Sequence, residues 1–286
     1  MRTELCERLG IEVPIFAFTH CRDVVVEVSR AGGLGVLGAA GFRPEQLEKE
    51  LQWIDDQVDG KPYGVDVIMP VEYVDADPKA LADMIPEPKH AIRQKEAGLD
   101  FVIAQGHEAG GHTGEIATMV LTPEVVRTVA PMPVLSAGGI ATGQQVAAAL
   151  ALGAQGAWCG SVWLTTKESD VDPLPKRKLI EAKSSDTVRT RMLSGKPARM
   201  LRSELTDAWN DPDCPGFLPM PLQGMLIHDA RVRVMKFEVE PLEFYPTGQV
   251  VGMMNEERSV RDVMFEMISD CVDTLEHLHS LLDQSK

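Results

Sequence analysis

Short apolar runs alternate with helical segments through roughly the first 165 residues, and this alternation is the strongest constraint on the fold of the 286-residue chain. The runs carry almost no charge, as strands do when both faces of a sheet are covered. The intervening segments, such as 43–58 with Pro44 near its start, have the spacing of amphipathic helices. The pattern predicts an α/β fold with a parallel sheet covered by helices. The expected strands are 13–18, 34–39, 62–69, 99–105, 132–137 and 154–164.

The rhythm of strands and helices is lost in the C-terminal part of the chain. Residues 184–201 look helical, Pro and Gly dominate 212–224, and 259–282 reads as a final amphipathic helix. We therefore predict a β/α core over 1–165. The remainder, 166–286, is predicted to be an elaboration that packs on this core and includes the terminal helix.

The charge and the cysteine content exclude several classes of protein. The formal net charge is −15 and no basic stripe interrupts it, so we expect no nucleic-acid partner. No apolar run approaches the ~18 to 20 residues that span a bilayer, and the N-terminus lacks the apolar core of a signal peptide. Five cysteines without a C-x-x-C pair indicate free thiols. These features favour a cytoplasmic protein that binds no membrane.

Three glycine-bearing segments follow expected strands: "QGHEAGGHTG" (105–114), "AGGIATG" (137–143) and "CGS" (159–161). In parallel α/β proteins ligands bind at the carboxyl ends of strands, where glycine lets a backbone approach them closely. The second segment leads into a helix expected near Gln144, so its N–H groups should form a cradle for an anion. None of the three is a dinucleotide or Walker motif, and only their combination indicates a phosphate site.

The histidines of the first segment almost form the zinc motif H-E-x-x-H. That motif needs its histidines four residues apart on one helical face. His107 and His112 are five apart, which separates them by about 140° around a helix. The paired glycines between them also disfavour a helix, and no third ligand is apparent. We expect no metal site.

The string "AQGHEAGGHTG", followed by "PVLSAGGIATGQQVAAALALGAQGAWCGS", resembles the nitronate monooxygenase family. The segments "PIFAF", "AGGLGVLGA", "PYGVDVIMP" and "PTGQVVGMM" fit the same family, so the similarity covers most of the chain except about 70–90. The resemblance implies a TIM-barrel enzyme with FMN as its cofactor. It also implies that alkyl nitronates are oxidised with O₂, which makes a small molecule and O₂ the expected partners.

The resemblance also implies roles for individual residues. His112 matches the catalytic histidine, acting as a base or as a hydrogen-bond donor to the substrate. An imidazole suits this chemistry because its pKa lies near neutrality. Positions matching flavin contacts are Gln105 and Gly110. The two phosphate-binding turns match Gly138 and Gly139, and Gly160 and Ser161, flanked by Trp158 and Cys159. Asp66 falls beside the flavin ring, where the family usually has Asn.

The chain departs from the family pattern in three places. The first strand ends in "AFTH", with His20, where the family has "A-P-M". Asp66 can only accept hydrogen bonds when ionised, whereas Asn can donate. No strand is evident between 70 and 98, so six strands stand where a TIM barrel has eight. Either a segment near 85–88 is absent, or the barrel is open, or another chain completes it; an open edge favours a homo-oligomer.

Two other functions fit the same residues. One is an NAD(P)H-dependent flavin reductase that acts on quinones or enoyl thioesters. The other is a non-catalytic flavin- or nucleotide-binding protein, for which Asp66 and the altered first-strand loop are the motivation. The sequence does not identify the physiological substrate.

Overall fold

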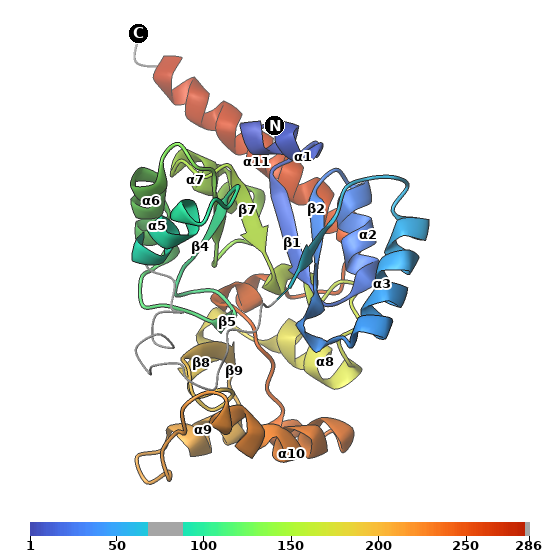
Figure 1. Ribbon diagram of the computed structural model, residues 1–286, viewed down its shortest axis with the longest axis vertical. Helices are drawn as coiled ribbons and strands as arrows, with labels where there is room; N and C mark the ends of the chain where they lie inside the picture. Colours follow the sequence, from blue (N-terminus) through green and yellow to red (C-terminus); the bar gives the residue numbers. More distant parts are fainter. Residues whose placement is uncertain (68–87, 284–286) are drawn as a thin grey trace.

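The computed structural model describes residues 1–67 and 88–283, and its centre is a curled six-stranded parallel sheet (Figure 1). The strand order is β3-β2-β1-β7-β6-β4, and every neighbouring pair is parallel. Each strand overlaps one of the predicted apolar runs, which confirms the predicted TIM-barrel-like α/β fold. The strands are β1 (Ile15–Thr19), β2 (Leu34–Gly38), β3 (Gly64–Asp66), β4 (Val102–Gln105), β6 (Val134–Ala137) and β7 (Gly156–Cys159).

The strand order is that of a β/α barrel interrupted at one place. From β1 the sheet continues through β2 to β3 in one direction, and through β7 and β6 to β4 in the other. In the described part of the chain no strand joins β3 to β4, and the two strands predicted to be missing would lie there. Most of the junction near 85–88 lies outside the described residues.

Helices cover the outer face of this sheet. In Figure 1, α2 and α3 lie beside β1 and β2, and α5, α6 and α7 lie beside β4 and β7. Helix α7 begins with a capping box in which Thr142 and Gln145 exchange hydrogen bonds. The helices are α2 (Arg22–Arg30), α3 (Pro44–Gln57), α5 (Pro88–Glu96), α6 (Thr118–Val129) and α7 (Gly143–Ala151).

The predicted terminal helix is α11 (Val260–Asp283), and it packs against α7 and α2. Met264 and Met267 of α11 are almost fully buried in one cluster with Val24 of α2 and Val146 of α7. Gly143 allows this approach, because a Cβ there would collide with the backbone of Cys271. The core therefore includes the end of the chain, and the predicted boundary at residue 165 stays a prediction.

A short N-terminal helix that the sequence analysis missed, α1 (Glu4–Leu9), closes the amino end of the sheet. The Thr3 hydroxyl accepts from Cys6 N of α1 and donates to the carbonyl of Gln155, just before β7. Leu5 and Cys6 pack on Phe16 of β1 inside the curl of the sheet. The amino end of the described sheet is thus filled with side chains.

The prediction of a helix over 184–201 was wrong. After a short 3₁₀ turn (Ser184–Asp186), this segment forms the antiparallel hairpin β8 (Thr187–Thr190) and β9 (Ala198–Leu201). Gly195 has a φ of 85° and Pro197 follows it, so the middle of the segment cannot be helical. Strand β9 also pairs with β5 (Gly111–His112), which gives a second sheet in the order β5-β9-β8.

Three more helices lie in the C-terminal part, and none of them was predicted. They are α8 (Pro173–Glu181), α9 (Glu204–Asn210) and α10 (Leu222–Lys236). Helices α9 and α10 lie next to β8 and β9, away from α11 (Figure 1). The remaining 3₁₀ turns are Ala39–Gly41, Ser161–Trp163, Glu240–Leu242 and Gln249–Met253. Among the described residues no helix is both long and apolar enough to cross a membrane.

Candidate functional site

A cavity of about 630 Å³ opens at the carboxyl ends of the strands. Its size lies within the range of small-molecule and cofactor sites. All ten residues that the sequence analysis assigned to the site line this cavity, although they come from four strands and three loops. They are Asp66, Gln105, Gly110, His112, Gly138, Gly139, Trp158, Cys159, Gly160 and Ser161. The structure therefore brings the predicted residues together; their individual roles stay predictions.

His112 is held at the cavity by its backbone and by its ring. It forms part of β5, opposite Ala198 of β9, and its carbonyl accepts from Nε2 of Gln105 at 2.9 Å. Its own Nε2 lies 2.6 Å from Oγ of Ser194, in the turn between β8 and β9. The Gln105 amide thus supports the histidine loop rather than standing free in the cavity.

The surroundings of His112 favour its neutral form. The residue is exposed through the cavity, but protein atoms surround the ring on its other sides. This burial lowers the pKa of His112, and the nearby charge of Lys196 lowers it further. A neutral imidazole can take a proton from a carbon acid or donate its remaining proton to a substrate oxygen.

The loop before His112 is fixed at both of its ends. The Glu108 carboxylate accepts from the N–H and the hydroxyl of Thr118, both at 2.9 Å, and so caps the start of α6. Gly110 packs against the backbone of the C-terminal segment, where an added Cβ would lie only 2.7 Å from the carbonyl carbon of Thr247. Only glycine fits at this contact, which explains why the motif has glycine at position 110.

The two glycine turns lie on neighbouring strands, β6 and β7. Gly138 and Gly139 have φ values of 99° and 72°, which favour glycine. In the described part of the chain, the N–H groups of Gly139 and Gly160 donate to no protein acceptor. Ser161 accepts from the N–H of Gly248 at 2.8 Å, which ties the second turn to the C-terminal segment.

The predicted anion cradle is smaller than expected. Oε1 of Gln145 already accepts from the N–H groups of Ala141 at 2.8 Å and Thr142 at 3.1 Å. The first turn of α7 also faces α11. The start of α7 is therefore used within the protein, and the part of this segment that reaches the cavity is Ala137 to Ile140.

The other predicted residues contribute in different ways. Trp158 stacks on Phe18, with ring centroids 5.8 Å apart, and both rings line the cavity. The Cys159 thiol points instead into the helix-side core, where burial raises its pKa to about 12, so only the backbone of Cys159 faces the cavity. Asp66 is exposed at the end of β3. His20 also lines the cavity, with Nδ1 2.9 Å from the carbonyl of Gly38.

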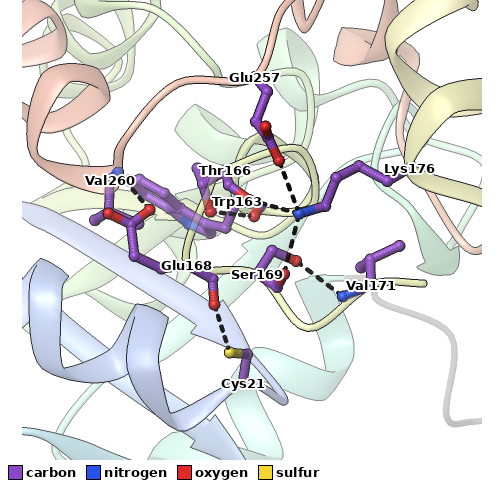
Figure 2. A network of polar contacts seen from close by, with 9 residues as sticks. All are labelled: Cys21, Trp163, Thr166, Glu168, Ser169, Val171, Lys176, Glu257 and Val260. Carbon is purple, nitrogen blue, oxygen red and sulfur yellow. Dashed lines mark hydrogen bonds and ion pairs between the residues drawn. The ribbon is translucent and has the colours of Figure 1, made fainter. Parts of the chain in front are cut away.

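The C-terminal elaboration supplies a wall of the cavity that sequence reasoning missed. Its polar members are Ser169, Asp170, Arg231 of α10 and Tyr245. Figure 2 shows how the loop before α8 is held: Nζ of Lys176 donates to the carbonyls of Thr166 and Ser169 and pairs with Glu257 at 3.2 Å. No local motif marked these residues, because tertiary packing alone brings them to the cavity.

The near-zinc motif does not assemble. The His107 carbonyl accepts from Nε of the buried Arg199 at 3.2 Å, and its ring lies beside that guanidinium rather than in the cavity. Positive charge next to an imidazole disfavours a bound cation. Over the described ranges, no three His, Cys, Asp or Glu side chains are grouped closely enough to hold a metal ion.

Fold and cavity together define a TIM-barrel-like protein whose cavity lies at the carboxyl ends of its parallel strands, where proteins of this fold bind their ligands. Residues 84–270 match the family model described as nitronate monooxygenase. This match covers more than half of the chain. The chain belongs to the nitronate monooxygenase family and is therefore an enzyme of the oxidoreductase class.

Rv1533 from Mycobacterium tuberculosis, provisionally assigned as a monooxygenase, is 42% identical over 375 aligned residues covering 99% of this chain and 100% of the relative. Because this chain has 286 residues, the relative contains residues with no counterpart here. A second M. tuberculosis protein, (3aS,4S,5R,7aS)-5-hydroxy-7a-methyl-1-oxo-octahydro-1H-indene-4-carboxyl-CoA dehydrogenase, is 34% identical and covers 72% of this chain and 68% of that protein. The structure of FabK from Thermotoga maritima superposes with a TM-score of 0.83 at 29% identity, covering 98% and 99%.

Proposed function

We propose that this chain is an FMN-dependent oxidoreductase of the nitronate monooxygenase type, which oxidises alkyl nitronates with O₂. One observation carries the proposal: His112 and both glycine turns line the same cavity. A proton-handling group and a phosphate-binding backbone are thus available to a single bound flavin and its substrate. The substrate class and the cofactor are drawn from the family, and the geometry supports them.

The residues present fit FMN. Two turns on adjacent strands offer N–H groups that no acceptor in residues 1–67 and 88–283 takes up, as a phosphate group needs, without a lysine. In this proposal Gly138, Gly139, Gly160 and Ser161 would hold the phosphate, flanked by Trp158 and Cys159, and Gln105 and Gly110 would contact the flavin. When bound, FMN would accept electrons from the carbanion-like substrate and pass them to O₂.

His112 acts on the substrate in this proposal. Its lowered pKa leaves the imidazole neutral at neutral pH, so it can take the acidic proton beside a nitro group or donate to a nitronate oxygen. The contact with Ser194 fixes the ring plane. Asp66 stands where the family has Asn, and as a carboxylate it offers the ring only acceptors. We expect it to disfavour a negatively charged flavin.

A second candidate is an NAD(P)H-dependent reductase that acts on quinones or enoyl thioesters. One comparison favours it: the 34% identity with a dehydrogenase whose named substrate is a CoA compound. Both activities would use the same cavity and the same histidine. Oxidation of NADH or NADPH by the purified protein separates them, because nitronate oxidation by O₂ needs no reduced nicotinamide.

An absorption spectrum of the purified protein, taken before and after heat release of the ligand, tests the cofactor. The proposal expects a yellow protein that releases FMN, and a colourless protein that cannot be reconstituted with FMN contradicts it. The variant His112→Ala should keep FMN and lose activity, whereas the control His277→Ala, at an exposed position of α11, should keep both. Flavin that binds but is reduced by neither nitronates nor NAD(P)H would indicate the non-catalytic alternative.

A further inference from the structure

Helix α10 carries a charged residue on its inward face. Its buried residues Gln223, Ile227 and Val234 are 0%, 3% and 6% exposed and recur at helical spacing on one stripe. Arg231 lies four residues after Ile227 and three before Val234, so it belongs to the same stripe. It is half-buried and lines the cavity. An apolar residue would satisfy this position if packing were its only task.

The two polar residues of this stripe differ in their partners. The Gln223 amide accepts from the N–H of Leu218 at 3.0 Å and donates to the carbonyl of Met192 at 2.9 Å. The Arg231 guanidinium has five donors, but across the described residues it makes no hydrogen bond and no ion pair within 4.0 Å. Because the guanidinium faces the cavity, its N–H groups are available to an acceptor that a substrate carries.

The protein groups around Arg231 do not neutralise it directly. Burial raises the pKa of Glu243, and the charges of Lys178 and Arg231 oppose that rise, so Glu243 lies within electrostatic reach of Arg231 but forms no ion pair with that residue. Asp170 lines the same cavity, and Asp172 lies near it in sequence. These carboxylates keep the wall from being broadly positive, so attraction of an anion depends on direct contact with the guanidinium.

Tyr245 adds a second donor to the same wall. It lines the cavity, and its hydroxyl makes no hydrogen bond with the described part of the protein. Burial raises the pKa of Tyr245, and the charge of Asp170 raises it further, so the hydroxyl keeps its proton at neutral pH. A guanidinium fork beside a phenolic O–H matches the oxygen geometry of a carboxylate or a phosphate.

We propose that Arg231, with Tyr245, forms a recognition subsite for an oxyanion, carboxylate or phosphate, that the substrate carries away from its reacting carbon. The subsite rests on the proposed function, because it assumes that the reaction takes place in the same cavity that binds the oxyanion. His112 and the glycine turns serve the reacting end and the cofactor, whereas the C-terminal wall selects the far end of the substrate. The preferred substrates are therefore anionic at a second point, and neutral analogues are poor substrates.

Matched substrate pairs test this subsite. One pair is the nitronates of 4-nitrobutanoate and 1-nitrobutane; the other is crotonyl-CoA and the crotonyl thioester of N-acetylcysteamine, assayed with NADH or NADPH. In Arg231→Gln, kcat/KM for the anionic member of one pair should fall about ten- to a hundredfold, as loss of a charged hydrogen bond implies. The neutral member should change less than about threefold. The affected pair shows whether the oxyanion is a carboxylate or a phosphate.

Two further variants separate recognition from folding. Arg231→Lys keeps the charge and should recover part of the loss. Arg233→Gln is the control, since Arg233 is exposed on the same helix and donates to its own helix at the carbonyl of Asp229. Equal losses for the anionic and neutral members, or no loss for either anion, would overturn the subsite.

A binding measurement keeps the subsite distinct from the proposed reaction. Titration calorimetry with 4-nitrobutanoate and with CoA needs no turnover. The subsite is supported if the dissociation constant for either compound rises about tenfold in Arg231→Gln and stays unchanged in Arg233→Gln. This result supports the subsite even when the protein oxidises no nitronate. The absence of binding by both compounds, or equal binding by both variants, contradicts it.

Discussion

Nε2 of His112 lies 2.6 Å from Oγ of Ser194, a residue 82 positions further along the chain. The Ser194 hydroxyl also accepts from the N–H of Lys196 at 3.3 Å. The hairpin that carries Ser194 holds the backbone of the histidine as well, through the pairing of His112 with Ala198. A single hairpin of the C-terminal part therefore sets both the position and the orientation of the candidate catalytic ring.

Replacing Ser194 with Ala should lower kcat without releasing FMN. The loss of one side-chain hydrogen bond is worth about 1 kcal/mol, which corresponds to roughly a fivefold fall in rate. Ser194→Thr keeps the hydroxyl and should recover the rate. Steady-state kinetics and the flavin spectrum of both variants check this. Equal activity of the Ala and Thr variants would show that the contact does not orient the ring.

Removing the charge of Lys196 should move the acid limb of the pH–rate profile. Burial and then Lys196 lower the pKa of His112, so the imidazole stays neutral to a lower pH than usual. In Lys196→Met the repulsion is lost and the pKa of His112 rises. Activity that needs the neutral ring should then be lost at a higher pH than in the wild type. A profile of kcat/KM against pH measures the shift, and Lys95→Met, on the distant helix α5, is the control. An acid limb that stays in place or moves to lower pH would contradict the assignment.

Much of the barrel could be predicted because short stretches of sequence indicate its strands and turns. Each apolar run reports a strand covered on both faces, and each glycine turn lies directly after its strand. The hairpin at 184–201 was mispredicted because the helical reading overlooked Gly195 and Pro197, whose backbone limits end a helix. Ser194 and Arg231 carried no local signal at all. The role of Ser194 depends on the pairing between β5 and β9, and that of Arg231 depends on which face of α10 packs inward. Both are set by long-range contacts.

The five cysteines should differ sharply in reactivity toward iodoacetamide. Cys6, Cys21, Cys159 and Cys271 are buried, and burial raises the pKa of Cys159 to about 12 and of Cys271 to about 11. Cys214 alone is partly exposed. At about pH 8, near the ordinary thiol pKa, native protein should be labelled at Cys214 only. Mass spectrometry of native and urea-unfolded samples checks this. Fast labelling of Cys159 in the native protein would show that its thiol faces the cavity after all.

Gly110→Ala should loosen the histidine loop and weaken flavin binding. The new Cβ would lie 2.7 Å from the carbonyl carbon of Thr247 and 2.8 Å from the N–H nitrogen of Gly248, and both are backbone atoms that cannot rotate away. Overpacking of this kind costs about 1–3 kcal/mol. Gly41→Ala is a matched control, because a Cβ there meets nothing within 4 Å. Urea unfolding gives the free energy of unfolding of both variants, and flavin fluorescence gives the dissociation constant for FMN. If Gly110→Ala matched Gly41→Ala in both quantities, the contact between this loop and the segment around Thr247 would not support the site.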